Sequence, residues 1–485
     1  MAEHTPSQLL AQPEDPHRST PGRREREEEE EGGRARRSQA ATEELVEKID
    51  YVDPQRCLRL RQKSSKTVIE SGQEGQATVD DGIPLKRIQG PADVEAFFNS
   101  IALDRLLQVL LNISNRIARF GILENDRQVS YLKTSLEQSP TVRAVVGIFE
   151  RLDQWITEIP LDPTPQRFGN KAFKIWGHRL ESEAQNLHTQ AGVITEYHKP
   201  IETELLHHFK TSFGSFGRLD YGTGHELSFL AYLSILHLTR ILQPKEFILS
   251  GLIIYQKYFN LCRRLQRVYN LEPAGSKGVY GLDDFFHVVY IFGSAQLLYH
   301  PTIRPSSILD EKLMSRVNET EPGGGGGGGG LAESSSDFLR REGLTRSLFF
   351  EAVQNTLSLK TRPIPKDSLP KTTTTTTTTM RMGEQRHEEG SEQQGLLDHS
   401  PILLNLATNV KGWPKIYGGL IKMMKGEIFA KVPVMQHFWV AGPTAVLPWL
   451  ACPPTIPGSL PLDHQDQQHA DEPDLDYINH YRPLS

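Results

Sequence analysis

Apolar residues recur at spacings of three and four along much of this chain, and this periodicity limits the possible folds more than any other feature. Long examples span residues 94–120, 142–159 and 247–269. Such spacing places the apolar side chains on one face of an α-helix. Alternation with a period of two, which indicates strands, is scarce, and no repeat period stands out. The sequence therefore predicts an all-α fold, an irregular bundle around long buried helices.

Four segments are too polar or too simple in composition to pack. Residues 1–50, 315–340, 362–398 and those from about 456 onward are rich in Glu, Gln, Ser, Pro, Gly or Thr, and two of them contain runs of eight glycines and eight threonines. Such segments bury too little apolar surface to offset the entropy lost on ordering. We expect disordered tails and two loop insertions, leaving roughly 340 residues for one large domain or two subdomains.

Charge and cysteine content narrow the functional class. Lys and Arg number 54 and Asp and Glu 60, a net charge of −6, whereas nucleic-acid binding needs an excess of positive charge. Cys57, Cys262 and Cys452 are too far apart in sequence for a dense disulfide framework or a Cys-rich zinc site. No secretory signal opens the chain, and no stretch of about 20 residues is free of charges and helix breakers. We expect a cytoplasmic protein with no nucleic-acid or membrane partner; the basic cluster at residues 34–37 leaves a nuclear fraction open.

A glycine-containing loop at Arg218–Glu226 leads directly into the apolar run 227–242. A helix that starts at Thr223 or Gly224 would present free N–H groups, which suit an anion such as phosphate, and Arg218 would add a charge-assisted contact. The alternative is an ordinary helix start with Thr223 as the N-cap and Glu226 in the first turn. The local residues alone favour this alternative.

Two further loops carry candidate ligands. In Glu272–Phe285, the adjacent Asp283 and Asp284 suit a hard cation such as magnesium; alternatively, Asp283 caps the next helix and Asp284 is solvated. The polar pair Gln436–His437 lies between apolar neighbours and is placed to face a cleft, although a lone His is more often structural. Signatures of standard ATPases, kinases, hydrolases and metalloproteases are absent.

Taken together, these segments resemble the phosphotyrosyl phosphatase activator family, also called type-2A protein phosphatase activators. The resemblance covers roughly residues 84–442 apart from the two insertions, so 1–83 and 443–485 are predicted to be mostly disordered tails. The shared segments, in order, are Arg167–Phe173, Arg218–Glu226, Glu272–Phe285, Gly293–Gln296, His300–Pro301, Trp413–Ile416 with Gly419–Leu420, and Pro433–Phe438.

The resemblance implies an all-helical fold in which two lobes flank a deep cleft. It also implies a regulator that binds the catalytic subunit of type-2A-like Ser/Thr phosphatases and converts it to the active form with ATP and magnesium. Peptidyl-prolyl cis/trans isomerase activity, and so binding of proline-containing segments, is implied as well. By resemblance, magnesium lies near Gly278 and Asp284. The residues implied for ATP are Arg218, Thr223, Gly224 and Gly275, with Gln436 and His437 closing the site.

The sequence departs from the family pattern at three positions and allows other functions. Phe216 stands where the family prefers small polar residues, Tyr280 where it often has Trp, and Pro414 directly follows Trp413. A free-standing isomerase and a helical scaffold without activity are the competing readings. No isomerase residue is assignable, because a dry groove that binds a twisted amide needs no particular side chain. Since the nucleotide loop matches neither common ATP-binding type, we expect the phosphatase to complete the site.

Overall fold

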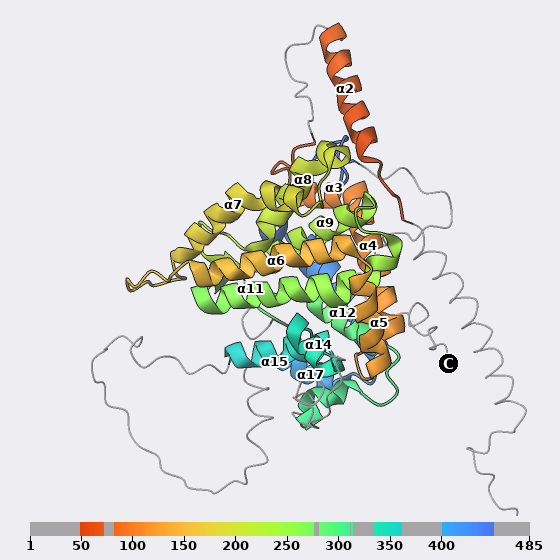
Figure 1. Cartoon of the computed structure of the whole chain (residues 1–485), viewed down its shortest axis with the longest axis vertical. Helices are drawn as coiled ribbons and strands as arrows, with labels where there is room; N and C mark the ends of the chain where they lie inside the picture. The colour runs from red at the N-terminus through yellow and green to blue at the C-terminus, as the bar shows by residue number, and fades with distance from the viewer. Residues whose placement is uncertain are drawn as a thin grey trace, which may run out of the picture.

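Helices make up nearly all of the regular structure, and the all-α prediction is confirmed (Figure 1). No helix in the described part of the chain is long and apolar enough to span a bilayer. The computed structural model describes residues 49–71, 82–275, 281–310, 312–313, 334–360 and 400–450.

The first half of the domain follows the predicted periodicity with one break. The run 94–120 forms two helices, because the Ser100 hydroxyl accepts a hydrogen bond from the Leu103 N–H at 3.3 Å and caps the second helix. The helices up to the first candidate loop are α2 (Pro54–Ser71), α3 (Pro91–Phe98), α4 (Ile101–Phe120), α5 (Asp126–Glu137), α6 (Pro140–Glu158), α7 (Ala172–Gln190), η1 (Glu196–Ile201), α8 (Glu202–Lys210) and η2 (Thr211–Phe213).

In the second half, the run 247–269 is helical throughout but includes a π-helical turn, η4 (Ser250–Ile254). This turn brings Gly251 against α4, where an added Cβ would overlap the Ile117 side chain. The other helices are α9 (Thr223–Leu238), η3 (Pro244–Glu246), α10 (Phe247–Leu249), α11 (Tyr255–Tyr269), α12 (Val288–Leu297), η6 (Pro305–Leu309), α14 (Ser335–Glu342), α15 (Leu348–Lys360), α17 (Pro401–Asn409), α18 (Trp413–Met423), η9 (Met424–Phe429, π-helical) and α19 (Val432–Met435).

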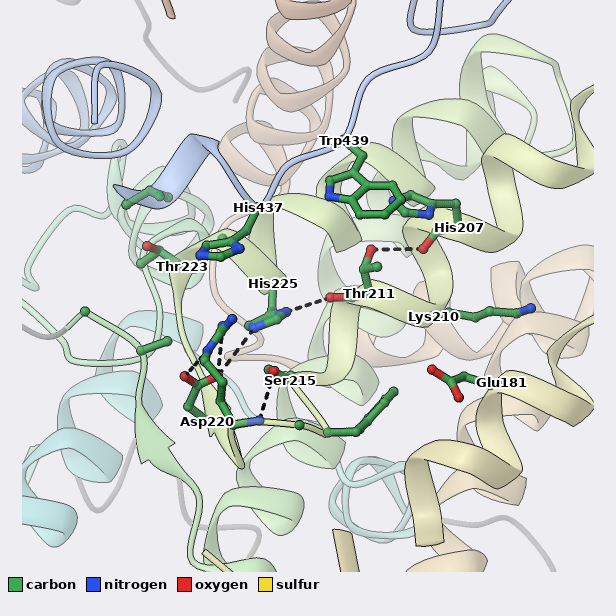
Figure 2. A pocket seen from close by; sticks show the side chains of 18 of the residues that line it. Glu181, His207, Lys210, Thr211, Ser215, Asp220, Thr223, His225, His437 and Trp439 are labelled. Atoms are coloured by element: carbon green, nitrogen blue, oxygen red, sulfur yellow. Dashed lines mark hydrogen bonds and ion pairs between the residues drawn. The ribbon is translucent and has the colours of Figure 1, made fainter. Parts of the chain in front are cut away.

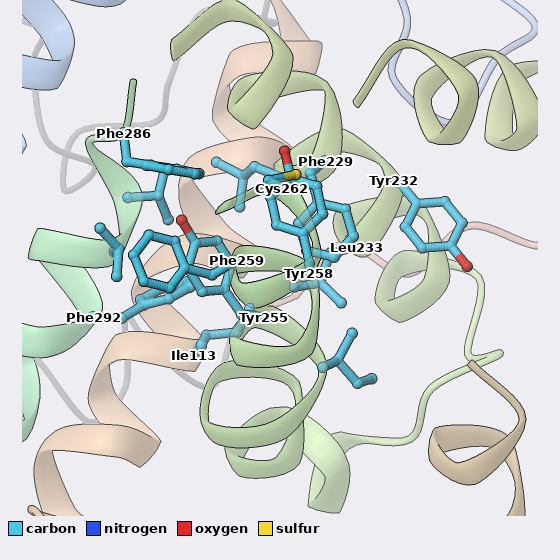
Figure 3. Close-up of a cluster of buried hydrophobic side chains, with 14 of the residues drawn as sticks. Ile113, Phe229, Tyr232, Leu233, Tyr255, Tyr258, Phe259, Cys262, Phe286 and Phe292 are labelled. Atoms are coloured by element: carbon cyan, nitrogen blue, oxygen red, sulfur yellow. The ribbon is translucent and has the colours of Figure 1, made fainter. Parts of the chain in front are cut away.

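Helix α9 is the centre of the core. Every residue from Glu226 to Leu238 is buried, so this helix has no solvent face, as expected for a helix that is apolar all round. Its Phe229 ring stacks on Tyr258 of α11, with centroids 3.6 Å apart, and Tyr255 meets Phe292 of α12 edge-on at 5.0 Å (Figure 3). The first contact holds α9 against α11 and so helps to position the loop that precedes α9, and the second joins α11 to α12.

The buried Glu226 carboxylate ties α9 to α12. It accepts hydrogen bonds from the Tyr255 hydroxyl and from the N–H groups of His287 at 2.6 Å and Val288 at 3.0 Å. These are N–H groups at the start of α12, which no side chain of its own N-cap residue satisfies. Burial raises the pKa of Glu226 to about 7, although the surrounding donors oppose that shift.

The folded part extends beyond residues 84–442 at both ends. Residues 49–71 belong to the fold: the Val52 N–H donates to the Leu238 carbonyl at 2.8 Å, and Cys57 is buried. At the other end, the buried Glu204 accepts the N–H groups of Val446 and Leu447, each at 2.8 Å. Hydrogen bonds to polar groups help to attach both segments to the fold. Such contacts leave no apolar pattern in the sequence, which is why both segments were predicted to be tails. Helix α14 likewise begins inside the predicted insertion 315–340, whereas both homopolymer runs lie outside the described residues.

Candidate functional site

A two-residue parallel strand pair joins the two glycine-containing loops. Strand β1 (Asp220–Tyr221) pairs with β2 (Glu272–Pro273). The Glu272 N–H donates to the Leu219 carbonyl at 3.1 Å, and the Ala274 N–H donates to the Tyr221 carbonyl at 2.7 Å. Segments about 50 residues apart in sequence therefore lie side by side, at the start of α9.

Glycines allow these segments to approach closely. A Cβ at Gly222 would lie 2.8 Å from the Ala274 carbonyl oxygen, too close for any other residue without a backbone shift. A Cβ at Gly169 would lie 2.9 Å from the Leu219 Cβ. The neighbouring Asn170 N–H donates to the Tyr269 carbonyl at 2.6 Å, so the Arg167–Phe173 segment joins the same assembly. Three of the segments noted in the sequence thus meet at one place.

A pocket of about 800 Å³ opens beside this assembly (Figure 2). Its walls come from α7, α8, the loop before α9, residues 274–275 and the stretch 433–439. Gln436 is adjacent but does not line it, and its side-chain amide donates to the Pro433 carbonyl at 3.3 Å. The predicted nucleotide-site residues that do line the pocket are Arg218, Thr223, Gly224, Gly275 and His437.

Helix α9 begins at this pocket without a side-chain cap. Gly222 is the N-cap residue and Thr223 is the first helical residue, so the alternative in which the Thr223 hydroxyl caps the helix does not occur. The N–H groups at a helix start carry partial positive charge and have no partner within the helix. The start of α9 therefore offers donors to an anion in the pocket.

Arg218 and Asp220 form a two-pronged ion pair at the edge of the pocket. The guanidinium donates from Nε at 2.7 Å and from a terminal nitrogen at 3.1 Å. Asp220 also lies 4.0 Å from Nε2 of His225. Nδ1 of His225 lies 2.8 Å from the Thr211 carbonyl, which only accepts, so Nδ1 carries the proton. Burial lowers the pKa of His225 to about 4, so this ring is neutral at pH 7.

The wall opposite α9 has a positive bias that no sequence motif indicated. Lys174 of α7 and Lys210 of α8 line this wall and form no ion pair within the described chain. Glu181, which pairs with His178, is the acidic residue on the same wall. His207 and Trp439 complete this wall. The basic and aromatic residues of 207–210 were visible in the sequence, but nothing local showed which way they face.

The predicted magnesium ligands are placed differently. Asp284 is half-buried and does not line the pocket. Asp283 is engaged by the protein, accepting the Phe285 N–H at 2.7 Å and the Thr356 hydroxyl at 2.7 Å. It does not cap α12, whose N-cap residue is His287. Gly278 and Tyr280 lie outside the described residues. Within those residues, no three His, Cys, Asp or Glu side chains are grouped to hold a metal.

Two departures noted in the sequence have simple structural outcomes. Phe216 turns its ring onto Gly177 of α7, where a Cβ would overlap it, and meets Phe173 edge-on at 5.1 Å. It therefore lines the pocket from the α7 side while packing against the core. Pro414 occupies the first turn of α18, where a proline is well tolerated.

These features define a class: an all-helical protein with a pocket assembled from segments distant in sequence. A sequence model of the family described as phosphotyrosyl phosphate activator (PTPA) protein matches residues 84–370 and 385–449. The chain belongs to this family.

Similar proteins carry matching names. A probable serine/threonine-protein phosphatase 2A activator 2 from Dictyostelium discoideum is 31% identical over 75% of this chain and 64% of its own length. Serine/threonine-protein phosphatase 2A activator 1 from Saccharomyces cerevisiae is 30% identical over 76% of each chain. The crystal structure of a PP2A phosphatase activator has a TM-score of 0.56 and 26% identity, and the match covers 76% of this chain and 96% of that one.

Proposed function

We propose that this protein activates type-2A Ser/Thr protein phosphatases by binding the catalytic subunit and promoting its active conformation with ATP and magnesium. The names of the relatives and the family membership support the activator role. The observation that carries the nucleotide part is the pocket: Arg218 and Thr223 come from one loop and Gly275 from another, about 50 residues away, yet all three line it.

The residues present fit a nucleotide. The uncapped start of α9 offers N–H groups to a phosphate, and the Arg218 guanidinium adds a positive charge at the same edge. Gly275 adopts a φ of +73° with open space where a side chain would stand, so a ligand can approach its backbone. Bound ATP would supply the phosphate charge that these groups recognise.

The fit to magnesium is weaker. Asp284 and Gly278 remain the proposed protein contributors, and phosphate oxygens and water would provide the remaining ligands, as is usual for this ion. Arg218 lines the pocket and is about half-exposed. We therefore propose that the phosphatase completes the site. ATP should bind more tightly to the complex than to the free protein, and equal affinities would contradict this part.

Prolyl isomerase activity on proline-containing segments belongs to the proposal through the family resemblance. A cytoplasmic location is proposed from the cysteine content, and a nuclear fraction from the basic cluster at residues 34–37. Rotation about an X-Pro bond has a barrier of about 18–20 kcal/mol, and a groove lowers it by binding the twisted amide best. No side chain is assigned to this step.

A reconstitution assay tests the proposal. The purified protein is mixed with inactive type-2A catalytic subunit, and Ser/Thr phosphatase activity is measured with ATP and magnesium, with each alone and with neither. A gain that requires both supports the proposal. A folded protein that binds the phosphatase without activating it would contradict the activator role and favour a scaffold or an independent isomerase.

A further inference from the structure

Two consecutive histidines of α8 each stack against an aromatic ring from the stretch after α19. His208 stacks with Phe438, with centroids 5.3 Å apart and planes 29° apart. His207 stacks with Trp439 at 5.0 Å and 23°. The two stacks differ in exposure: Phe438 is 1% exposed, whereas Trp439 is 38% exposed. The inner stack belongs to the core, and the outer one forms part of the pocket wall.

One face of the Trp439 indole is open. His207 covers the other face, and Figure 2 shows the indole and His207 together at the pocket wall, opposite Thr223. None of the cation–ring contacts in the described chain involves Trp439. Burial, reinforced by Lys210, lowers the pKa of His207 to about 4, so the supporting ring is neutral at pH 7. The result is an uncharged platform of two rings with a free face.

The charges around this platform indicate the kind of ligand it takes. Lys174, Lys210 and Arg218 line the same pocket, and Thr223 at the start of α9 lies across it from Trp439 (Figure 2). A ligand that joins a flat aromatic ring to a chain of negative charges matches both ends. We propose that Trp439, supported by His207, is the stacking platform for the purine base of a nucleotide whose phosphates lie at the start of α9. This inference rests on the nucleotide part of the proposed function.

The observations favour a nucleotide over a peptide. A proline-rich peptide also docks on aromatic rings, but it has no dense negative charge for Arg218 and the start of α9. Every nucleobase has a π-face that stacks on an aromatic side chain. The volume of about 800 Å³ falls within the usual span of small-molecule pockets.

A pair of ligands separates the base from the phosphates. ATP and inorganic tripolyphosphate carry similar charge, but only ATP has a base. Binding of each is measured by calorimetry to the full-length chain, and to its complex with the phosphatase catalytic subunit. Trp439→Ala is expected to weaken ATP binding roughly 5- to 160-fold, the range that base–aromatic stacking provides, and to leave tripolyphosphate binding unchanged. Trp439→Phe, which keeps a ring, should retain most of the affinity.

The chain provides a matched control in Trp449. This partly buried tryptophan stacks with Phe97 at 6.5 Å and does not line the pocket. Trp449→Phe should leave both affinities unchanged. ATP should quench the tryptophan fluorescence of the wild type and of Trp449→Phe, but not that of Trp439→Phe, a signature that a purely structural role would not produce.

Several results would overturn the inference. Equal losses of ATP and tripolyphosphate binding in Trp439→Ala would show that the ring only supports the pocket, and no loss would show that the base lies elsewhere. Loss of proline-peptide binding with ATP binding intact would assign the platform to a peptide. If the wild type binds neither ligand, alone or in the complex, the nucleotide part of the proposed function fails and the platform with it. Phosphatase activation in the reconstitution assay would then still be measurable separately.

Discussion

Two buried glutamates form the same kind of contact, but the segments that they hold differ in their importance for the fold. Glu226, in the first turn of α9, accepts N–H groups of residues 287–288 at 2.6 and 3.0 Å. Glu204, in the first turn of α8, accepts those of residues 446–447 at 2.8 Å. Both carboxylates are fully buried, and burial raises the pKa of each to about 7. Each thus holds a segment that is remote in sequence onto a helix next to the pocket.

The difference lies in what each carboxylate holds. The segment at Glu226 is the start of α12, which packs against α4, α15 and α18 and therefore belongs to the centre of the molecule. The segment at Glu204 is the irregular stretch 441–450 after α19, attached through single contacts such as the hydrogen bond from Arg105 to the Val446 carbonyl at 2.6 Å. The same hydrogen-bond chemistry is therefore expected to contribute global stability in one case and local order in the other. The contribution of a buried hydrogen bond to the stability of the whole molecule thus depends on which elements it connects.

The largest expected effect is that of Glu226→Ala. Removing this carboxylate leaves N–H groups of α12 and the Tyr255 hydroxyl buried without an acceptor, at a cost of about 3–5 kcal/mol in the free energy of unfolding. Urea unfolding followed by circular dichroism measures this loss, and Glu226→Gln, which keeps one acceptor oxygen, should lose less. A loss below that of the corresponding Glu204 variant would break the comparison.

A pH titration of stability provides the second test. The folded pKa of Glu226, about 7, lies above its ordinary value of 4.5, so the folded state binds the proton more tightly. The resulting stabilisation is complete below pH 4.5 and is lost as the pH rises through 7, with a slope of at most about 1.4 kcal/mol per pH unit. Unfolding free energies of the wild type and Glu226→Gln, measured from pH 4.5 to 8, should differ by this slope. Parallel curves would show that the carboxylate is ionised throughout.

Glu204→Ala should have a smaller and more local effect. We expect a loss of about 1–3 kcal/mol, because two N–H groups lose their acceptor. Hydrogen exchange should accelerate at residues 441–450 and not in α12. Nucleotide binding should persist if Trp439 keeps its place, so a simultaneous collapse of both regions would contradict the division into a global and a local anchor.

Much of the fold was predictable because helical periodicity is a local signal. The run 142–159 became α6 (Pro140–Glu158) with only small changes at its ends. Local periodicity did not show the break at Ser100, where a single hydroxyl starts a new helix. It also missed the folded residues 49–71, whose attachment depends on contacts such as the ion pair between Asp50 and Arg105. Long-range polar contacts leave no periodic pattern in the sequence.

The candidate site was predictable only in part, for the same reason. The resemblance identified Arg218 and Thr223, and the loop glycines indicated close approach, which Gly222 shows. The opposite wall depends on how α7 and α8 pack, so Lys174 and Trp439 carried no recognisable signal. The role of Asp284 as a magnesium ligand remains a prediction, because Asp284 does not line the pocket.

The substitution Asp284→Asn extends the comparison to a carboxylate that we propose binds magnesium rather than stabilises the fold. Asparagine keeps the size and one acceptor oxygen, so the unfolding free energy should change by less than about 0.5 kcal/mol, in contrast to either glutamate. Magnesium-dependent activation of the phosphatase should fall, while isomerisation of a free proline peptide persists, if the two activities are separate. A stability loss as large as that of Glu204→Ala would instead make Asp284 a third structural carboxylate. Activation that is unchanged at limiting magnesium would remove it from the proposed ligand set.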